Sequence, residues 1–204
     1  MYYILEENDL IEPGPYSAVY DGESSALEPI DFISGNVLDL KLDEPVVIRL
    51  YEYTEGDTGM ADFYSLPFPI MSDTMFRTLT MLGVSNLQTW PATLLVPNQN
   101  ECIDTYKIVN IIGTIAAADM TRSDYIDMGG SGRIAVGFRN LVIDEQKADG
   151  AKMFRLAESP STIIIHEDIK AGLEDCCLKY LRFIPCIEID MDEEFNIDDY
   201  NWDD

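Results

Sequence analysis

Short runs of β-branched and aliphatic residues recur along the chain, and their length predicts β-strands rather than helices. The clearest run, Val46–Tyr51, reads VVIRLY and follows Pro45. Stretches rich in Gly, Pro, Asp and Ser separate the runs and predict loops, above all in residues 8–45. The predicted strands are residues 2–5, 46–51, 92–96, 106–112, 141–143, 153–156 and 162–165, and residues 181–189 are predicted to close the fold as an extended segment.

The apolar pattern changes to helical spacing in two places. The first helix is predicted to begin at Ser72 or Asp73, whose side-chain oxygens can cap it, and to end at Gly83. A second helix is predicted directly after His166, over residues 167–175. The apolar positions of the first helix are Met75, Phe76, Leu79 and Leu82.

Strands mixed with two sparse helices predict an α+β fold with mixed or antiparallel sheets and a few helices. The 204 residues, 47% of them hydrophobic, suit a single compact domain with a sizeable core. We assign residues 1–189 to this domain and leave open its division into an N-terminal subdomain, 1–100, and a C-terminal core, 101–189. Residues 190–204 form an acidic C-terminal segment.

The charge balance is strongly acidic. The chain has 38 Asp and Glu residues against 13 Lys and Arg residues, a net charge of −25, and the excess is divided almost equally between its two halves. A field of this sign repels nucleic acid and anionic membranes, so neither is expected as a partner. It attracts cationic proteins and speeds their encounter, although solubility is an equally good explanation of the charge taken alone.

The start of the chain and its cysteines are typical of a cytoplasmic protein. The first ten residues have no basic segment of the kind that opens a signal peptide, and no apolar run approaches the length of a membrane span. The cysteines have neither a CxxC pair nor a regular disulfide spacing, so we expect four reduced thiols, mostly buried. They are Cys102, Cys176, Cys177 and Cys186.

No motif in the chain carries a recognisable catalytic apparatus. The single histidine, His166, has no nucleophile elbow to serve, and we expect it to cap or pack the start of the second helix. The glycine-rich run 129–133 lacks the spacing of a phosphate-binding loop and predicts a turn. An EF-hand loop that starts at Asp190 or at Asp192 would lack the glycine required at its sixth position and the glutamate required at its twelfth. We therefore expect no enzyme activity, no cofactor and no metal.

Several segments of the second half follow the order found in one bacterial family. They are residues 106–110, Ala118-Asp119 with Ser123, residues 153–158, residues 163–170 with Leu173-Glu174, and Leu178 with residues 183–185, and weaker echoes lie at 32–35, at 62–63 and at Ser72. In these segments the chain resembles the bacterial immunity-protein family of polymorphic toxin systems, a Myxococcus-type immunity domain formerly catalogued as a domain of unknown function. The resemblance covers roughly residues 100–187. It implies a single cytoplasmic domain that binds and neutralises a cognate toxin without enzymatic activity.

The segments that carry the resemblance are predicted to build the core rather than the binding surface. Arg155 and Glu158 are expected to form a local pair with a structural role. The strand residues expected to face inward are Phe154, Leu156, Ile163, Ile165 and Phe183.

The function predicted from charge and resemblance together is stoichiometric binding of a cognate protein toxin that has a basic surface. The alternatives left open are an acidic adaptor or regulatory protein-binding module and a hydrolase that uses clustered carboxylates. Apolar edge strands also leave open a homodimer. The residues predicted to bind the partner lie in the acidic, aromatic C-terminal segment: Asp190, Asp192, Glu193, Glu194, Asp198, Asp199, Tyr200 and Trp202.

Overall fold

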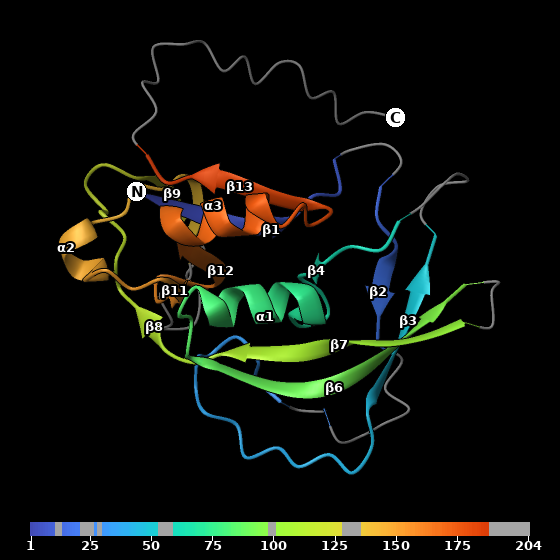
Figure 1. Cartoon of the computed structure of the whole chain (residues 1–204). Coiled ribbons are helices and arrows are strands. Elements are labelled where there is room, and N and C mark those ends of the chain that lie inside the picture. The colour runs from blue at the N-terminus through green and yellow to red at the C-terminus, as the bar shows by residue number, and fades with distance from the viewer. Residues whose placement is uncertain are drawn as a thin grey trace, which may run out of the picture.

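In the part of the chain that the structure describes, the domain has two mixed β-sheets, a two-stranded ribbon and three helices (Figure 1). The computed structural model describes residues 1–10, 14–20, 27, 30–52, 59–97, 101–127 and 136–187. The predicted α+β class with mixed sheets is confirmed. The C-terminal segment and the glycine-rich run 129–133 lie outside the described residues.

The first sheet has six strands, of which the long antiparallel pair β6–β7 is the centre. β3 runs parallel to β6, and the short strands β2, β4 and β5 complete the edges. The order across the sheet is β2 (Ser17–Val19), β3 (Val46–Tyr51), β6 (Leu87–Val96), β7 (Glu101–Ile111), β5 (Ile70–Ser72) and β4 (Phe63–Tyr64).

The second sheet has five strands and brings the start of the chain against its later part. Its order is β13 (Leu181–Pro185), β1 (Tyr2–Glu7), β12 (Ser159–His166), β11 (Met153–Leu156) and β8 (Thr114–Ile115). A separate ribbon pairs β9 (Asp124–Asp127) with β10 (Val136–Asn140). The chain passes from the second sheet to the first between β1 and β2, before residue 100, and returns to the second sheet between β7 and β8, after residue 100. A subdomain boundary at that residue stays a prediction.

Both predicted helices are confirmed, together with their first capping residues. Ser72 Oγ accepts a hydrogen bond from the Met75 amide at 3.1 Å and begins α1 (Asp73–Met81), which is followed by Gly83 with a φ of +87°. His166 Nδ1 accepts from the Asp168 amide at 3.3 Å and begins α3 (Glu167–Asp175). α1 lies against β7, α3 lies against β1 and β12, and the two helices contact each other. The third helix is the short α2 (Glu145–Ala148).

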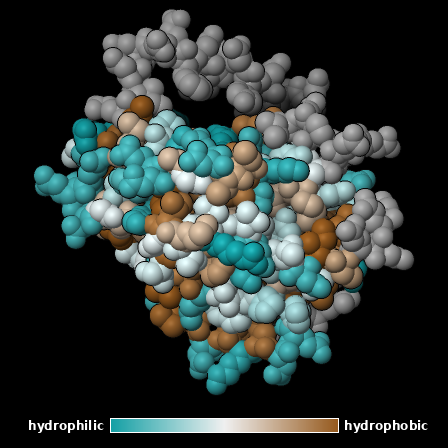
Figure 2. Space-filling model, in the orientation of Figure 1, coloured by the Kyte–Doolittle hydropathy of each residue, from teal (hydrophilic) through white to brown (hydrophobic). Residues whose placement is uncertain are grey.

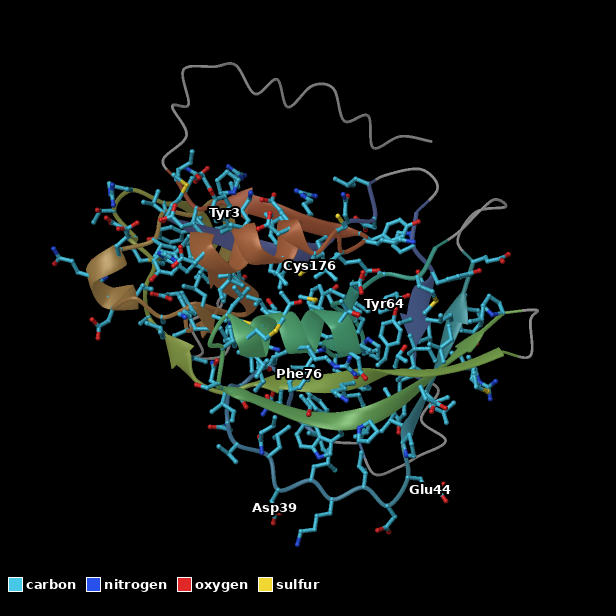
Figure 3. All side chains as sticks on the ribbon, in the orientation of Figure 1. Tyr3, Asp39, Glu44, Tyr64, Phe76 and Cys176 are labelled. Atoms are coloured by element: carbon cyan, nitrogen blue, oxygen red, sulfur yellow. The ribbon has the colours of Figure 1, made fainter. Side chains whose placement is uncertain are left out.

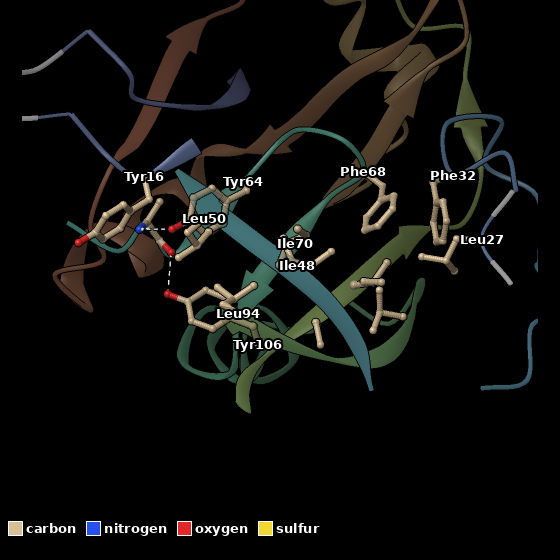
Figure 4. Close-up of a cluster of buried hydrophobic side chains, with 14 of the residues drawn as sticks. Tyr16, Leu27, Phe32, Ile48, Leu50, Tyr64, Phe68, Ile70, Leu94 and Tyr106 are labelled. Atoms are coloured by element: carbon tan, nitrogen blue, oxygen red, sulfur yellow. Dashed lines mark hydrogen bonds between the residues drawn. The ribbon is translucent and has the colours of Figure 1, made fainter. Parts of the chain in front are cut away.

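Alternating strand positions fill three hydrophobic clusters. In β12, Ile163 and Ile165 face a central cluster shared with α1 and α3, whereas Ile164 faces the outer cluster of the second sheet. In β7, Val109 faces the central cluster and Ile108 faces the outer cluster of the first sheet, shown in Figure 4. Of the residues predicted to face inward, Phe183 is half-buried and the other four are buried.

An extended segment leading into β3 covers the outer cluster of the first sheet without joining the sheet as a strand. Its alternate leucines pack on the cluster, and its backbone is bound by side chains of β6. Gln88 exchanges hydrogen bonds of 2.8 and 3.1 Å with the Leu38 backbone, and the indole of Trp90 donates to the Leu40 carbonyl at 2.9 Å. Figure 3 shows Asp39 on the outer side of this segment.

The predicted strand over residues 141–143 is wrong. Its side chains are buried as the apolar run suggests, but only Ile143 forms a bridge, with Ala118, and the strand of this region is β10. The backbone of Val142 bonds instead to a loop, since its amide donates to Ser123 Oγ at 2.9 Å and its carbonyl accepts from the Asp119 amide at 2.8 Å. Loop groups thus satisfy the backbone that a strand ladder was expected to satisfy.

The expectation of mostly buried cysteines is also wrong. All four thiols are free, but Cys102, Cys176 and Cys177 are exposed and only Cys186 is buried. Burial raises the pKa of the Cys186 thiol to about 12, so this thiol stays protonated at neutral pH.

Candidate functional site: a cleft between the two sheets

A cleft of about 940 Å³ opens where the second sheet approaches the edge of the first. β1, β11 and β12 line one side of it, and β2 with the β4–β5 connection lines the other. Phe138 of the β9–β10 ribbon also lines the cleft, so the ribbon contributes as well as the two sheets. The site therefore combines residues that are far apart in the sequence.

The β4–β5 connection places an apolar side chain at the mouth of the cleft. Pro67 and Pro69 prevent a regular ladder here, because proline has no amide hydrogen to donate. Phe68 is buried in the outer cluster of the first sheet, whereas Leu66 is 72% exposed. An exposed leucine next to a cleft is a candidate anchor for a protein partner.

A second apolar side chain at the mouth belongs to a tight loop. Asp31 Oδ1 accepts hydrogen bonds from the Ile33 and Ser34 amides, both at 3.0 Å, and the Gly35 carbonyl accepts from the Gly113 amide at 2.7 Å. This bonding fixes the loop against the β7–β8 connection and leaves Ile33 49% exposed. Ile33 and Leu66 together form what we call the apolar mouth.

Acidic side chains at the end of β1 form one wall of the cleft. They are Glu6, Glu7 and the nearby Asp9. Burial, opposed by the hydrogen bond from the Ser65 amide at 3.3 Å and aided by the charge of Asp9, raises the pKa of Glu7 to about 7. Glu7 is therefore about half ionised at neutral pH, and a cation bound beside it would favour the ionised form.

Arg155 lies in the part of the cleft formed by β11 and β12. Its side chain is 1% exposed, and Nη1 donates to the Pro160 carbonyl at 2.8 Å. The local pair predicted with Glu158 is wrong, because Glu158 Oε1 turns to accept from the Ala118 amide at 3.3 Å. Burial lowers the pKa of Arg155 to about 10, against the favourable charge of Asp31, so the guanidinium still carries its charge at neutral pH.

The cleft does not gather carboxylates around the histidine, which is the arrangement that would favour the alternative of a hydrolase. His166 is not among the residues that line it; this side chain caps α3 and packs edge-on against Tyr2, with ring centroids 5.2 Å apart. Among the described residues, no group of three or more His, Cys, Asp or Glu side chains is placed to hold a metal ion. The same residues include no helix long and apolar enough to cross a membrane.

The eight residues predicted to bind the partner all lie beyond Ile187, outside the described part of the chain. Their role stays a prediction. The sequence did not identify the cleft residues, although two signals point to them: Arg155 interrupts the apolar strand MFRL, and Leu66 stands in a turn next to Pro67. Hydrophilic and hydrophobic residues are mixed over the face of the molecule shown in Figure 2.

Comparison with known proteins gives one result. A search of curated proteins finds no match to this chain. The model of the family described as Immunity protein family (Imm11) matches residues 1–188, which include both sheets, all three helices and every residue that lines the cleft. The segments that resembled an immunity-protein family covered about the second half, and the family match extends over the first half as well. The chain therefore belongs to the immunity protein family Imm11.

Proposed function

We propose that this protein binds a cognate toxin domain and neutralises it by forming a stoichiometric complex. The observation that carries the proposal is the family match over residues 1–188, since an immunity protein implies a toxin from which it protects. Neutralisation of this kind requires no catalysis and no cofactor from the inhibitor. We place the binding in the cytoplasm of the cell that makes the toxin, as the resemblance implies.

The charge supports a toxin with a basic surface. A net charge of −25 attracts a cationic partner over a distance set by the ionic strength and speeds the first encounter. The cleft adds an acidic wall beside an apolar mouth, which suits a protein surface that carries Lys or Arg around an apolar side chain. The association rate is expected to fall as salt rises; an association rate independent of salt would contradict a basic toxin surface.

The test is co-expression with the toxin domain encoded beside this chain. Rescue of growth, together with a complex of one-to-one mass, is the expected result. An unrelated toxin domain is the matched control and should not be rescued. If neither rescue nor a complex occurs with any neighbouring toxin domain, the proposal is wrong. The mass of the free chain also decides whether it is a monomer or the homodimer that its edge strands allow.

The C-terminal segment is a second part of the proposal. It has eight acidic residues, and Tyr200 and Trp202 lie between them, so the segment combines negative charge with the aromatic anchors that are frequent in protein interfaces. A chain of residues 1–189 is expected to keep its unfolding midpoint and to bind the toxin more weakly. Unchanged affinity in the truncated chain would assign recognition to the body of the domain alone.

A further inference from the structure

Arg155 has an unused hydrogen-bonding edge. Its Nη1 bonds to the Pro160 carbonyl, but Nε and Nη2 are buried without a partner among the described residues. These two nitrogens lie on the same side of the planar guanidinium and point their hydrogens in parallel. This is the geometry that binds the two oxygens of a carboxylate at once.

The surroundings of Arg155 do not supply that carboxylate. Among the described residues, no acidic side chain lies within ion-pair distance of the guanidinium, and Asp31 acts on it only through space. Asp31 is instead occupied in its own loop, where Oδ1 accepts from the Ile33 and Ser34 amides. A buried, charged group without its hydrogen bonds is costly, and the cost is retained in the free chain.

The position of Arg155 shows from where a carboxylate would come. Arg155 lines the cleft together with the hydroxyl-bearing Ser161 and Thr162, and the apolar mouth belongs to the same cleft. A volume of about 940 Å³ admits several side chains of an entering segment. Because Nε and Nη2 are buried in the free chain, side chains that cover them must shift when the segment enters, as is common at interfaces.

We infer that the Nε–Nη2 edge of Arg155 binds a carboxylate of the toxin, carried by an Asp, a Glu or the chain terminus of a segment that enters the cleft. This inference rests on the proposed function. A carboxylate brings one negative charge, which neutralises the one charge of Arg155. A phosphate group brings more negative charge and would be repelled by the acidic wall of Glu6, Glu7 and Asp9.

The inferred toxin segment has a defined chemistry. Its carboxylate lies deep in the cleft, its apolar residues contact Ile33 and Leu66, and its basic residues meet the acidic wall. Such a segment joins opposite charges at fixed spacing, so it distinguishes the cognate toxin from one that is only basic.

Two substitutions at Arg155 test the inference with a catalytically inactive form of the toxin. Arg155→Met removes the buried charge and is expected to weaken toxin binding by about 30-fold or more. The denaturation midpoint should stay the same or rise, since the free chain loses an unpaired buried charge. Arg155→Lys keeps the charge but loses the bidentate edge, and a partial loss of affinity is expected. The matched control is Arg77→Met in α1, whose side chain is 73% exposed and lies outside the cleft.

A loss of affinity without a loss of stability separates binding from a purely structural role. A folded Arg155→Met variant that binds the toxin within about twofold of the natural chain would overturn the inference, since a desolvated charge pair contributes more than that. If this variant does not fold, the test moves to the toxin. One Asp→Asn or Glu→Gln substitution in the toxin, or amidation of its C-terminus, should then reproduce the loss of affinity for the natural chain. If none does, the inference is wrong. When the natural chain itself fails to bind, the proposed function fails; when it binds and only these variants show no effect, the inference alone fails.

Discussion

Met153 and Arg155 lie two residues apart on the same face of β11, yet they meet opposite surroundings. Met153 packs into the central cluster, in the region that α1 and α3 cover. Arg155 lies further along the strand and lines the cleft. Both side chains are buried, so burial alone does not distinguish them; what differs is whether the neighbours satisfy them.

The two ends of this face also differ in their polar groups. Near Met153, the Asn86 side-chain amide donates to the Ile112 carbonyl at 2.8 Å and to the Met153 carbonyl at 3.1 Å. Near the cleft, Arg155 keeps an edge without a partner among the described residues, and partial burial raises the pKa of Glu7. The polar groups at the helix-covered end thus bond within the domain, whereas the cleft end holds groups without a partner among the described residues, which the inferred toxin contact would use.

The largest expected effect is the difference in the free energy of unfolding between two Leu→Ala substitutions, one at the helix-covered end and one at the cleft end. Leu79→Ala removes a side chain with no exposed surface from the central cluster and should lower the free energy of unfolding by about 3 kcal/mol. Leu66→Ala at the apolar mouth should change it by less than about 0.5 kcal/mol, because this side chain is 72% exposed. Chemical denaturation measures both changes.

Toxin affinity should show the reverse order for these two variants. Leu66→Ala is expected to weaken binding by about 1 kcal/mol or more, whereas folded Leu79→Ala should bind like the natural chain. Unchanged affinity in Leu66→Ala would remove the apolar mouth from the interface and weaken the division of the molecule into a stable end and a binding end.

A substitution in the loop that carries Ile33 is expected to have an intermediate effect. Gly35 has a φ of +73°, and an added Cβ would lie 2.9 Å from Thr114 Cγ2 and 3.0 Å from the backbone carbon of Gly113. Gly35→Ala should therefore lower the free energy of unfolding by about 2 kcal/mol, from strain and crowding together. Gly150→Ala is the matched control, because Gly150 has a φ of +70° and an added Cβ would contact nothing within 4 Å. Equal losses in the two variants would show that the loop is not tightly docked on the β7–β8 connection.

Features governed by neighbouring residues could be predicted from the sequence. The Ser72 and His166 caps, the glycine after α1 and the alternation of β12 follow from local hydrogen bonding and side-chain direction. The pairing of β1 with β12 and β13 could not, because it joins residues 160 to 182 positions apart and depends on the whole sheet.

The candidate site depended on the same long-range arrangement. Arg155 and Glu158 were expected to pair because they are close in sequence, but β11 directs Arg155 into the cleft and Glu158 turns toward Ala118. The acidic wall and the apolar mouth come from β1, from the β4–β5 connection and from the loop of Ile33. No local pattern brings these three segments together, so the acidic and aromatic residues of the C-terminal segment were predicted as the binding site instead.

The smallest expected effect concerns pH and the acidic wall of the cleft. The pKa of Glu7 is raised from its ordinary 4.5 to about 7, so the folded chain holds a proton that the unfolded chain has already released in this interval. The contribution of Glu7 to the free energy of unfolding therefore falls as pH rises from about 4.5 to about 7, and it stays low above that. Glu7→Gln keeps an oxygen acceptor for the Ser65 amide but cannot ionise, so it should be more stable than the natural chain at pH 8 by an amount of order 1 kcal/mol, reduced because the side chain is partly solvated. At pH 4 both proteins hold a neutral side chain and should unfold alike, which makes that pH the internal control. Identical pH dependence in the two proteins between pH 4 and pH 8 would mean that water solvates Glu7 fully, and the contrast between the helix-covered end and the cleft end would then rest on Arg155 alone.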